Sequence, residues 1–219
     1  MVQILIKPLF PQLDRFLANL KPSDTTREFI DGRGYQKPRP QGTTIHLQTQ
    51  LWDTINAASP VPQQAIAYPN HRCSFGAWSL VPTLAIFFDP LLSVPPGDSA
   101  PQTDDSQADD SQADNSQADA QPPLDYSPLT PTYTRCPDWV IEVILPEQHS
   151  TQPLRSVLHC LSYGSQMAWL IDPGQHLVFV FRPDASACEF KQNQVLPVPE
   201  QVDLTLTVGQ ILSWIPAKR

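Results

Sequence analysis

Residues 137–173 read PDWVIEVILPEQHSTQPLRSVLHCLSYGSQMAWLIDP, and this stretch decides the fold. Every residue of 139–144 except Glu142 is apolar, which predicts a strand covered on both faces. Residues 167–171 (MAWLI) form a second apolar strand, and a helical pattern over 151–163 lies between the two. A strand, one helix and a strand at this spacing predict a parallel pair with a right-handed crossover. The predicted fold class is therefore α/β, with a mixed, α+β-like sheet.

The helix of this unit has recognisable ends. Ser150 and Thr151 cap its start, and Pro153 is tolerated in its first turn. Gly164 ends it in the left-handed conformation. We expect the face toward the sheet to be an apolar stripe, made of Leu154, Val157, Leu158 and Leu161.

Glu142 is the one charged residue of the first strand. A carboxylate buried in such a strand is costly unless it is paired or binds a metal. Glu142 is therefore the first candidate for a functional residue.

The remaining elements follow from hydrophobic periodicity and turn residues. Helices are predicted at 9–20, 43–57 and 208–214, and an Asp-Gly turn predicts a hairpin over 27–36. Strands are predicted at 64–68, 73–79, 83–88 and 177–181, with further edge strands at 188–190 and 194–196. The strand at 177–181 should pair antiparallel to 167–171.

An acidic repeat interrupts this pattern. Residues 104–118 repeat five residues three times, as DDSQA, DDSQA and DNSQA, without a large apolar side chain. Such a segment cannot bury enough surface to offset its ordering entropy. We therefore expect one domain over 1–94 and 132–219, with 95–131 as a disordered insertion. The repeat lacks the glycine and terminal glutamate of a calcium loop, which favours a solvated spacer over a calcium site.

The net charge of −8 arises in this insertion. Eight aspartates and no lysine or arginine lie between Asp98 and Asp125, so the remaining residues balance to zero. Charge therefore neither supports nor excludes nucleic-acid binding.

The cysteines and the apolar runs bear on the cellular compartment. Four scattered cysteines, with no CxxC pair, predict free thiols and neither a zinc site nor a disulfide framework. No run resembles a signal peptide or a membrane span, so a cytoplasmic protein without a membrane partner is expected.

Three runs carry a resemblance to a known family: PDWVIEVILPEQ (137–148), LHCLSYGSQMAWLIDP (158–173) and VFVFRPD (178–184). They resemble the Uma-two family of bacterial restriction-endonuclease-like proteins. The likeness extends to KPLFPQLDRFL (7–17), EFIDG (28–32), QKPRPQG (36–42), RCSFGAWSLVPTLAIF (72–87) and LTVGQILSWI (206–215). It implies a restriction-endonuclease-like PD-(D/E)XK core with flanking helices.

The resemblance also implies a site of three parts. An Asp after Pro lies on one strand, a Glu on the next and a Lys on the following helix. The two carboxylates hold Mg²⁺, because this hard cation prefers oxygen ligands. The metal activates a water, and the Lys stabilises the charge that develops on the phosphate of DNA.

Carried over to this chain, the site is incomplete. Glu142 falls on the family's glutamate, but Thr83 stands at the position of the metal-binding aspartate. Arg155 or Ser156 falls on the position of the lysine. The candidate catalytic residues are thus Glu142, Arg155 and Ser156, and Glu142 and Thr83 mark the metal position.

Two functions follow from this partial match. One is a Mg²⁺-dependent DNA endonuclease impaired by the lost Asp and Lys. The other, which these residues favour, is a family member that no longer cleaves and serves as a binding or interaction protein. A homodimer is left open by the sequence.

The partner of Glu142 is also open. We expect an ion pair with Arg155 that fills the vacated metal position. The alternative is a metal site that Asp89 or Asp138 completes.

Overall fold

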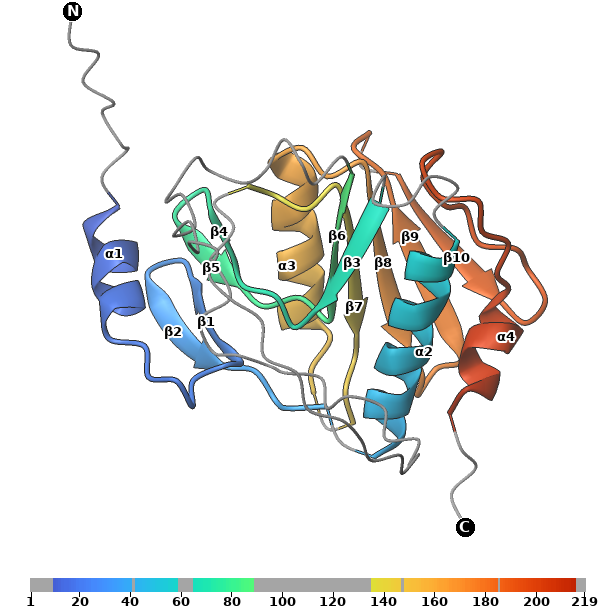
Figure 1. Cartoon of the computed structure of the whole chain (residues 1–219), viewed down its shortest axis with the longest axis horizontal. Coiled ribbons are helices and arrows are strands. Elements are labelled where there is room, and N and C mark those ends of the chain that lie inside the picture. The colour runs from blue at the N-terminus through green and yellow to red at the C-terminus, as the bar shows by residue number, and fades with distance from the viewer. Residues whose placement is uncertain are drawn as a thin grey trace, which may run out of the picture.

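The computed structural model describes residues 10–40, 42–58, 65–88, 135–146, 148–184 and 186–215. Within these ranges the chain forms a mixed α and β fold of two sheets and four helices (Figure 1). The acidic repeat and the whole segment predicted to be disordered, 95–131, lie outside the described residues.

The larger sheet contains the unit that decides the fold. Its strands, in spatial order, are β10 (Ala187–Lys191), β9 (Leu177–Phe181), β8 (Met167–Asp172), β7 (Trp139–Val143), β6 (Leu84–Phe88) and β3 (Ala65–Pro69). Strands β7 and β8 are parallel and are connected through α3 (Thr151–Ser162), which confirms the predicted unit. The other neighbours pair antiparallel, including β8 with β9 as predicted.

The smaller sheet has the order β2–β1–β5–β4. Its hairpin of β1 (Arg27–Ile30) and β2 (Arg33–Gln36) confirms the predicted Asp-Gly turn. The prediction of one strand over 73–79 was wrong, because the chain reverses there into β4 (Cys73–Phe75) and β5 (Trp78–Leu80). Gly76 and Ala77, at φ 55° and 64°, form a two-residue turn of the kind that matches the twist of a hairpin.

The helices complete a layered arrangement (Figure 1). α2 (Thr43–Ala57) and α4 (Val208–Ser213) cover one face of the larger sheet. α3 covers the other face and lies between the two sheets, whereas α1 (Pro11–Ala18) packs beyond the smaller sheet. The predicted edge strand at 194–196 reduces to an isolated bridge between Val195 and Thr207.

The face of α3 toward the sheet matches the predicted stripe in part. Val157 is fully buried and Leu154 and Leu161 pack against the same cluster, whereas Leu158 is 46% exposed. The helix is thus rotated part of the way from the leucine-rich face, and this brings three smaller residues into buried positions: Pro153, Ser156 and Cys160. This rotation places Ser156 inward and its neighbour Arg155 outward.

Strands on both sides of residues 89–134 belong to the larger sheet. β6 ends at Phe88, β7 begins at Trp139, and the two pair antiparallel. None of the described helices has the length and apolar character that crossing a membrane requires.

Candidate functional site

Thr83 and Glu142, the two positions that the resemblance assigns to carboxylates, meet on neighbouring strands. β6 pairs with β7 in a register that joins Leu84 to Ile141, so the next step places Thr83 opposite Glu142. The Thr83 hydroxyl accepts a hydrogen bond of 3.1 Å from the backbone N–H of Val143, which extends the contact between the strands. The predicted convergence of Thr83 and Glu142 is therefore present in the structure.

Glu142 points toward α3 and is fully buried. Its neighbours Ile141 and Val143 pack in the core on the other face of the sheet, as the alternation of a strand requires. Oε2 of Glu142 accepts hydrogen bonds from the backbone N–H of Thr83 at 3.2 Å and from its hydroxyl at 2.9 Å. A carboxylate in this position needs a cation as well.

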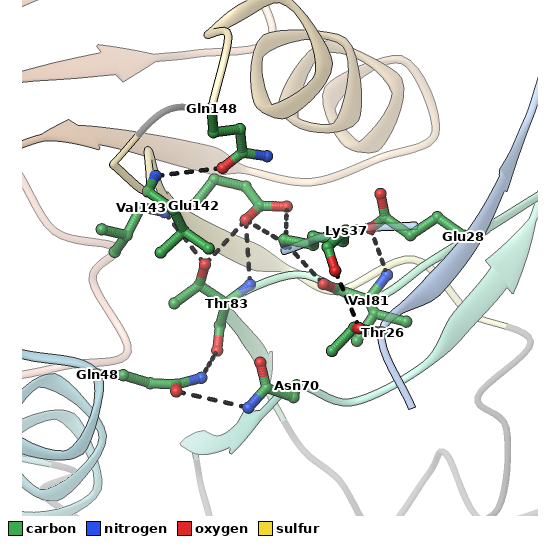
Figure 2. A network of polar contacts seen from close by, with 11 residues as sticks. Thr26, Glu28, Lys37, Gln48, Asn70, Val81, Thr83, Glu142, Val143 and Gln148 are labelled. Atoms are coloured by element: carbon green, nitrogen blue, oxygen red, sulfur yellow. Dashed lines mark hydrogen bonds and ion pairs between the residues drawn. The ribbon is translucent and has the colours of Figure 1, made fainter. Parts of the chain in front are cut away.

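Lys37 supplies that cation (Figure 2). Its Nζ lies 2.9 Å from Oε1 and 2.7 Å from Oε2 of Glu142, and it donates a third hydrogen bond of 2.7 Å to the carbonyl of Val81. The Lys37 side chain is 7% exposed and that of Glu142 1% exposed, so the ion pair is buried. The ammonium group has three protons, and each of these contacts can use one of them.

The hairpin of the smaller sheet holds Lys37 in place. One step beyond the pair Arg27–Gln36, the N–H of Lys37 donates to the carbonyl of Thr26 at 3.1 Å. The hydroxyl of Thr26 returns a hydrogen bond of 3.0 Å to the carbonyl of Lys37. The end of the small hairpin thus directs its lysine into the interior beside the larger sheet.

The expected ion pair between Glu142 and Arg155 does not form. Arg155 pairs with Asp31 in the β1–β2 turn, and its guanidinium lies 5.5 Å from the ring centre of Trp78. The Arg155 side chain is 38% exposed. The prediction failed because α3 turns its small residues toward the sheet and so carries Arg155 to the surface.

The other candidates are also occupied elsewhere. Ser156 is buried on α3, and within the described ranges its hydroxyl makes no hydrogen bond to Glu142. Asp138 accepts hydrogen bonds from Arg135 at 2.7 and 2.8 Å and from the N–H of Phe88 at 2.8 Å. Asp89 lies outside the described residues.

Glu28 is a second buried carboxyl group that the sequence reasoning missed. It is 1% exposed, and its Oε1 accepts a hydrogen bond of 2.9 Å from the N–H of Val81. Burial raises the pKa of Glu28, and the nearby Glu142 raises it further, whereas the Lys37 ammonium lowers it. Lys37 therefore contacts Glu142 directly and acts on Glu28 through its charge.

The sequence contains only a weak signal for Glu28 and Lys37. Glu28 lies two residues before Ile30, a buried residue of the same strand, and side chains two residues apart point to the same face. This spacing predicts an inward position for Glu28. Lys37 lies 105 residues before Glu142. No spacing rule connects two residues so far apart, and several other lysines and arginines were equally eligible.

A side chain of α2 also holds the backbone of Thr83 in place. Gln48 on α2 donates a hydrogen bond of 2.7 Å from Nε2 to the carbonyl of Thr83, and this contact is buried. Asn70 lies 3.5 Å from Oε1 of Gln48. Thr83 is thus held at its N–H, its carbonyl and its hydroxyl, which leaves it little freedom to turn toward a ligand.

The residues present do not fit a divalent cation. Mg²⁺ requires about six oxygens in near-octahedral geometry, whereas both oxygens of Glu142 already accept protons from Lys37. Thr83 offers a neutral hydroxyl that is itself donating to Glu142. Within the part of the chain that the structure describes, no group of three His, Cys, Asp or Glu side chains is arranged to hold a metal.

Comparisons with known proteins place this site in a family context. The family model Uma2, described as "Putative restriction endonuclease", matches residues 10–214. A crystal structure of a putative nuclease belonging to DUF820 from Anabaena variabilis ATCC 29413 matches with a TM-score of 0.73 and 29% identity. The match covers 93% of this chain and 98% of that one. No curated protein matches the chain at a significant level.

Proposed function

Because this chain belongs to the Uma2 family, whose model spans residues 10–214, we propose that it binds DNA and does not hydrolyse it through a metal at Glu142. The observation that carries the proposal is the buried contact of Lys37 with both oxygens of Glu142, at 2.9 and 2.7 Å. A protein cation holds the position where the family's chemistry requires a metal. The second function left open by the sequence, a non-cleaving binding protein, is therefore the better supported.

Hydrolysis of a phosphodiester at this site lacks three of its parts. Thr83 cannot supply the charge of the missing carboxylate. Arg155 stays protonated near neutral pH, so it cannot act as a base, and it is engaged with Asp31 at the surface. Ser156 carries no charge to stabilise the transition state.

A basic pocket supports DNA as the partner. Arg15 of α1 and Arg27 of β1 line a shallow pocket of about 300 Å³ together with the amides of Gln12 and Asn19. Arginines and side-chain amides are the groups that commonly contact DNA phosphates. Arg27 lies 3.8 Å from Asp24 and is 46% exposed, so this weak ion pair leaves it accessible to a phosphate.

Cleavage is tested with supercoiled plasmid DNA in Mg²⁺ or Mn²⁺. We expect the wild-type protein to nick the plasmid no faster than Glu142→Ala, purified in the same way. The matched variant separates activity of this chain from that of a contaminating nuclease. Metal-dependent cleavage that disappears in Glu142→Ala would overturn the proposal.

Binding is tested separately, by fluorescence anisotropy with a labelled DNA duplex. Affinity should fall steeply between about 50 and 200 mM salt, as expected for phosphate contacts. It should also fall about tenfold in the double variant Arg15→Ala/Arg27→Ala, because two charged contacts are lost. Arg182→Ala, at another exposed arginine, is the matched control. Absence of binding at low salt would reject DNA and favour a protein partner.

A residual metal-dependent endonuclease is the second candidate. The observation in its favour is Glu28, a second carboxyl group. It lies so close to Glu142 that the charge of Glu142 raises the pKa of Glu28. The plasmid experiment decides between the two candidates.

A further inference from the structure

The contacts of Lys37 resemble those of a bound cation. Its Nζ has three oxygen neighbours, at 2.7 Å from Val81 O, 2.7 Å from Glu142 Oε2 and 2.9 Å from Glu142 Oε1. Two of these oxygens belong to a carboxylate and one to a backbone carbonyl. This is the ligand chemistry of a hard divalent cation, with an ammonium at its centre.

A second carboxyl group lies in the same cluster. Val81 connects it to Lys37, because its carbonyl accepts from Lys37 while its N–H donates to Glu28. Thr83 holds the other carboxylate in place, because its hydroxyl donates to Glu142 Oε2 at 2.9 Å. All the side chains of this group are buried, and they come from both sheets and the segments that flank them.

We propose that the Lys37 ammonium substitutes for a divalent cation, and that removing it opens a calcium site formed by Glu28, Glu142 and the Val81 carbonyl. The inference rests on the proposed function in one respect, because it attributes the absence of cleavage to Lys37. It assigns a cause to that absence, and it names donors that the family match does not supply.

Charge and distance both favour calcium as the probe. Glu28 and Glu142 carry two negative charges when ionised, and Lys37 neutralises one of them; a divalent ion would neutralise both. Oxygen ligands lie about 2.3–2.6 Å from Ca²⁺ but about 2.0–2.1 Å from Mg²⁺. The oxygens around Nζ therefore need to close by only a few tenths of an ångström for calcium, and calcium tolerates irregular geometry.

Proton competition sets the pH at which the site is best observed. Without Lys37, the buried carboxyl group of Glu28 shares its site with Glu142 and no cation, so it should keep its proton to a higher pH. Burial already raises the pKa of Glu28, and Lys37 no longer opposes that rise. Calcium must displace this proton, so its apparent affinity should increase as the pH rises.

The experiment measures the melting temperature of Lys37→Ala with and without millimolar CaCl₂ at pH 8. We expect calcium to raise Tm of this variant by about 5–11 °C once its concentration is about a hundred times Kd. The rise should disappear in Lys37→Ala/Glu142→Gln and shrink in Lys37→Ala/Glu28→Gln. Wild-type protein should show no rise. Lys191→Ala, at an exposed lysine paired with Glu189, is the matched control and should also show none.

Each result decides the inference. If Lys37→Ala folds and calcium does not raise its Tm, the inference is overturned. It is also overturned if calcium raises the Tm of Lys37→Ala/Glu142→Gln. Failure of Lys37→Ala to fold even in calcium also counts against it, because the ion should replace the lost cation. Wild-type protein provides a test that needs no variant of Lys37: stabilisation by calcium that depends on Glu142 would show that Lys37 does not hold the position.

The outcome is distinguishable from failure of the proposed function. No DNA is present in this experiment, so calcium binding to Lys37→Ala can succeed while DNA binding by the wild-type protein fails. Likewise, DNA binding by the wild-type protein can succeed while calcium fails to bind Lys37→Ala.

Discussion

At the scale of single residues, the ion pair that Glu142 makes and the ion pair that Arg155 makes differ in burial. The Lys37–Glu142 pair is shielded from water, whereas the side chains of Arg155 and Asp31 are 38% and 57% exposed. An exposed pair contributes at most about 1 kcal/mol. Breaking a buried pair costs about 3–5 kcal/mol, because the remaining charge stays buried without a partner. The structural importance of a charged residue here follows from its depth and not from its position in a motif.

Glu28 gives a prediction about pH. Its pKa lies above the ordinary value of 4.5, and burial is the main cause. Between that value and the raised pKa, the folded chain keeps a proton that the unfolded chain has released. The contribution of Glu28 to stability is therefore complete below the unfolded pKa and is lost as pH rises through the folded pKa.

The measurement compares wild-type protein with Glu28→Gln by urea denaturation from pH 4.5 to 8. Relative to the wild type, the variant should gain stability as pH rises, by about 1.4 kcal/mol for each unit of difference between the two pKa values. Glu200→Gln, at an exposed position, should follow the wild-type curve. A constant difference between Glu28→Gln and wild type across the range would contradict the raised pKa.

At the scale of elements, the turn between β4 and β5 fixes the smaller sheet against α3. Gly76 has φ 55°, and an added Cβ would collide with the ring of Tyr163 at the end of the helix. The Tyr163 ring also contacts Phe75, at 5.7 Å between ring centres, and His159, at 4.6 Å. A side chain at residue 76 would therefore strain the backbone and displace this ring.

Gly76→Ala should lower the free energy of unfolding by about 2–3 kcal/mol, mostly the cost of a left-handed alanine, because the Tyr163 ring is 53% exposed and can move aside at a smaller cost. Urea denaturation measures the loss. In a Tyr163→Ala background the same change should cost only the backbone part, about 1–2 kcal/mol. Ala77→Gly is the matched control, since φ 64° already suits glycine, and it should cause no comparable loss. Equal costs in both backgrounds would show that Tyr163 does not press on the turn.

At the scale of the whole molecule, one ion pair joins two sheets. Lys37 follows β2 of the smaller sheet, and Glu142 lies on β7 of the larger sheet. The two sheets share a buried cluster with α3 between them. The position of the smaller sheet thus depends on the same contact that fills the site.

The predicted insertion also belongs to this scale. β6 and β7 are adjacent, and the N–H of Phe88 bonds to Asp138 at 2.8 Å, so a short connection can join them. Replacing residues 95–131 with a short Gly/Ser linker should change the free energy of unfolding by about 1 kcal/mol or less, because closure entropy depends weakly on loop length. Urea denaturation checks this. A loss of several kcal/mol would mean that the segment contributes to the fold.

Most of the fold was predictable because it depends on local pattern. The apolar strands at 139–144 and 167–171, the helix between them and the Asp-Gly hairpin follow from periodicity and turn residues, which act over a few positions. The errors lie where tertiary contact overrides that pattern. On α3 the prediction failed at Leu158, which is exposed while Ser156 and Cys160 are buried; Leu154 and Leu161 pack against the core as predicted. The turn at Gly76 was missed because a strand pattern contains no signal for two consecutive left-handed residues.

By itself the sequence determined that Glu142 is expected to be buried and to need a partner, and its family resemblance put the uncharged Thr83 at the position of the missing carboxylate. The tertiary structure alone decided which partner it has. Arg155 was the nearer candidate along the chain, but the helix rotation sends it to the surface, while the hairpin brings Lys37 from a distance of 105 residues. Charge pairing acts through space and is set by how the two sheets pack, so no local pattern could identify it.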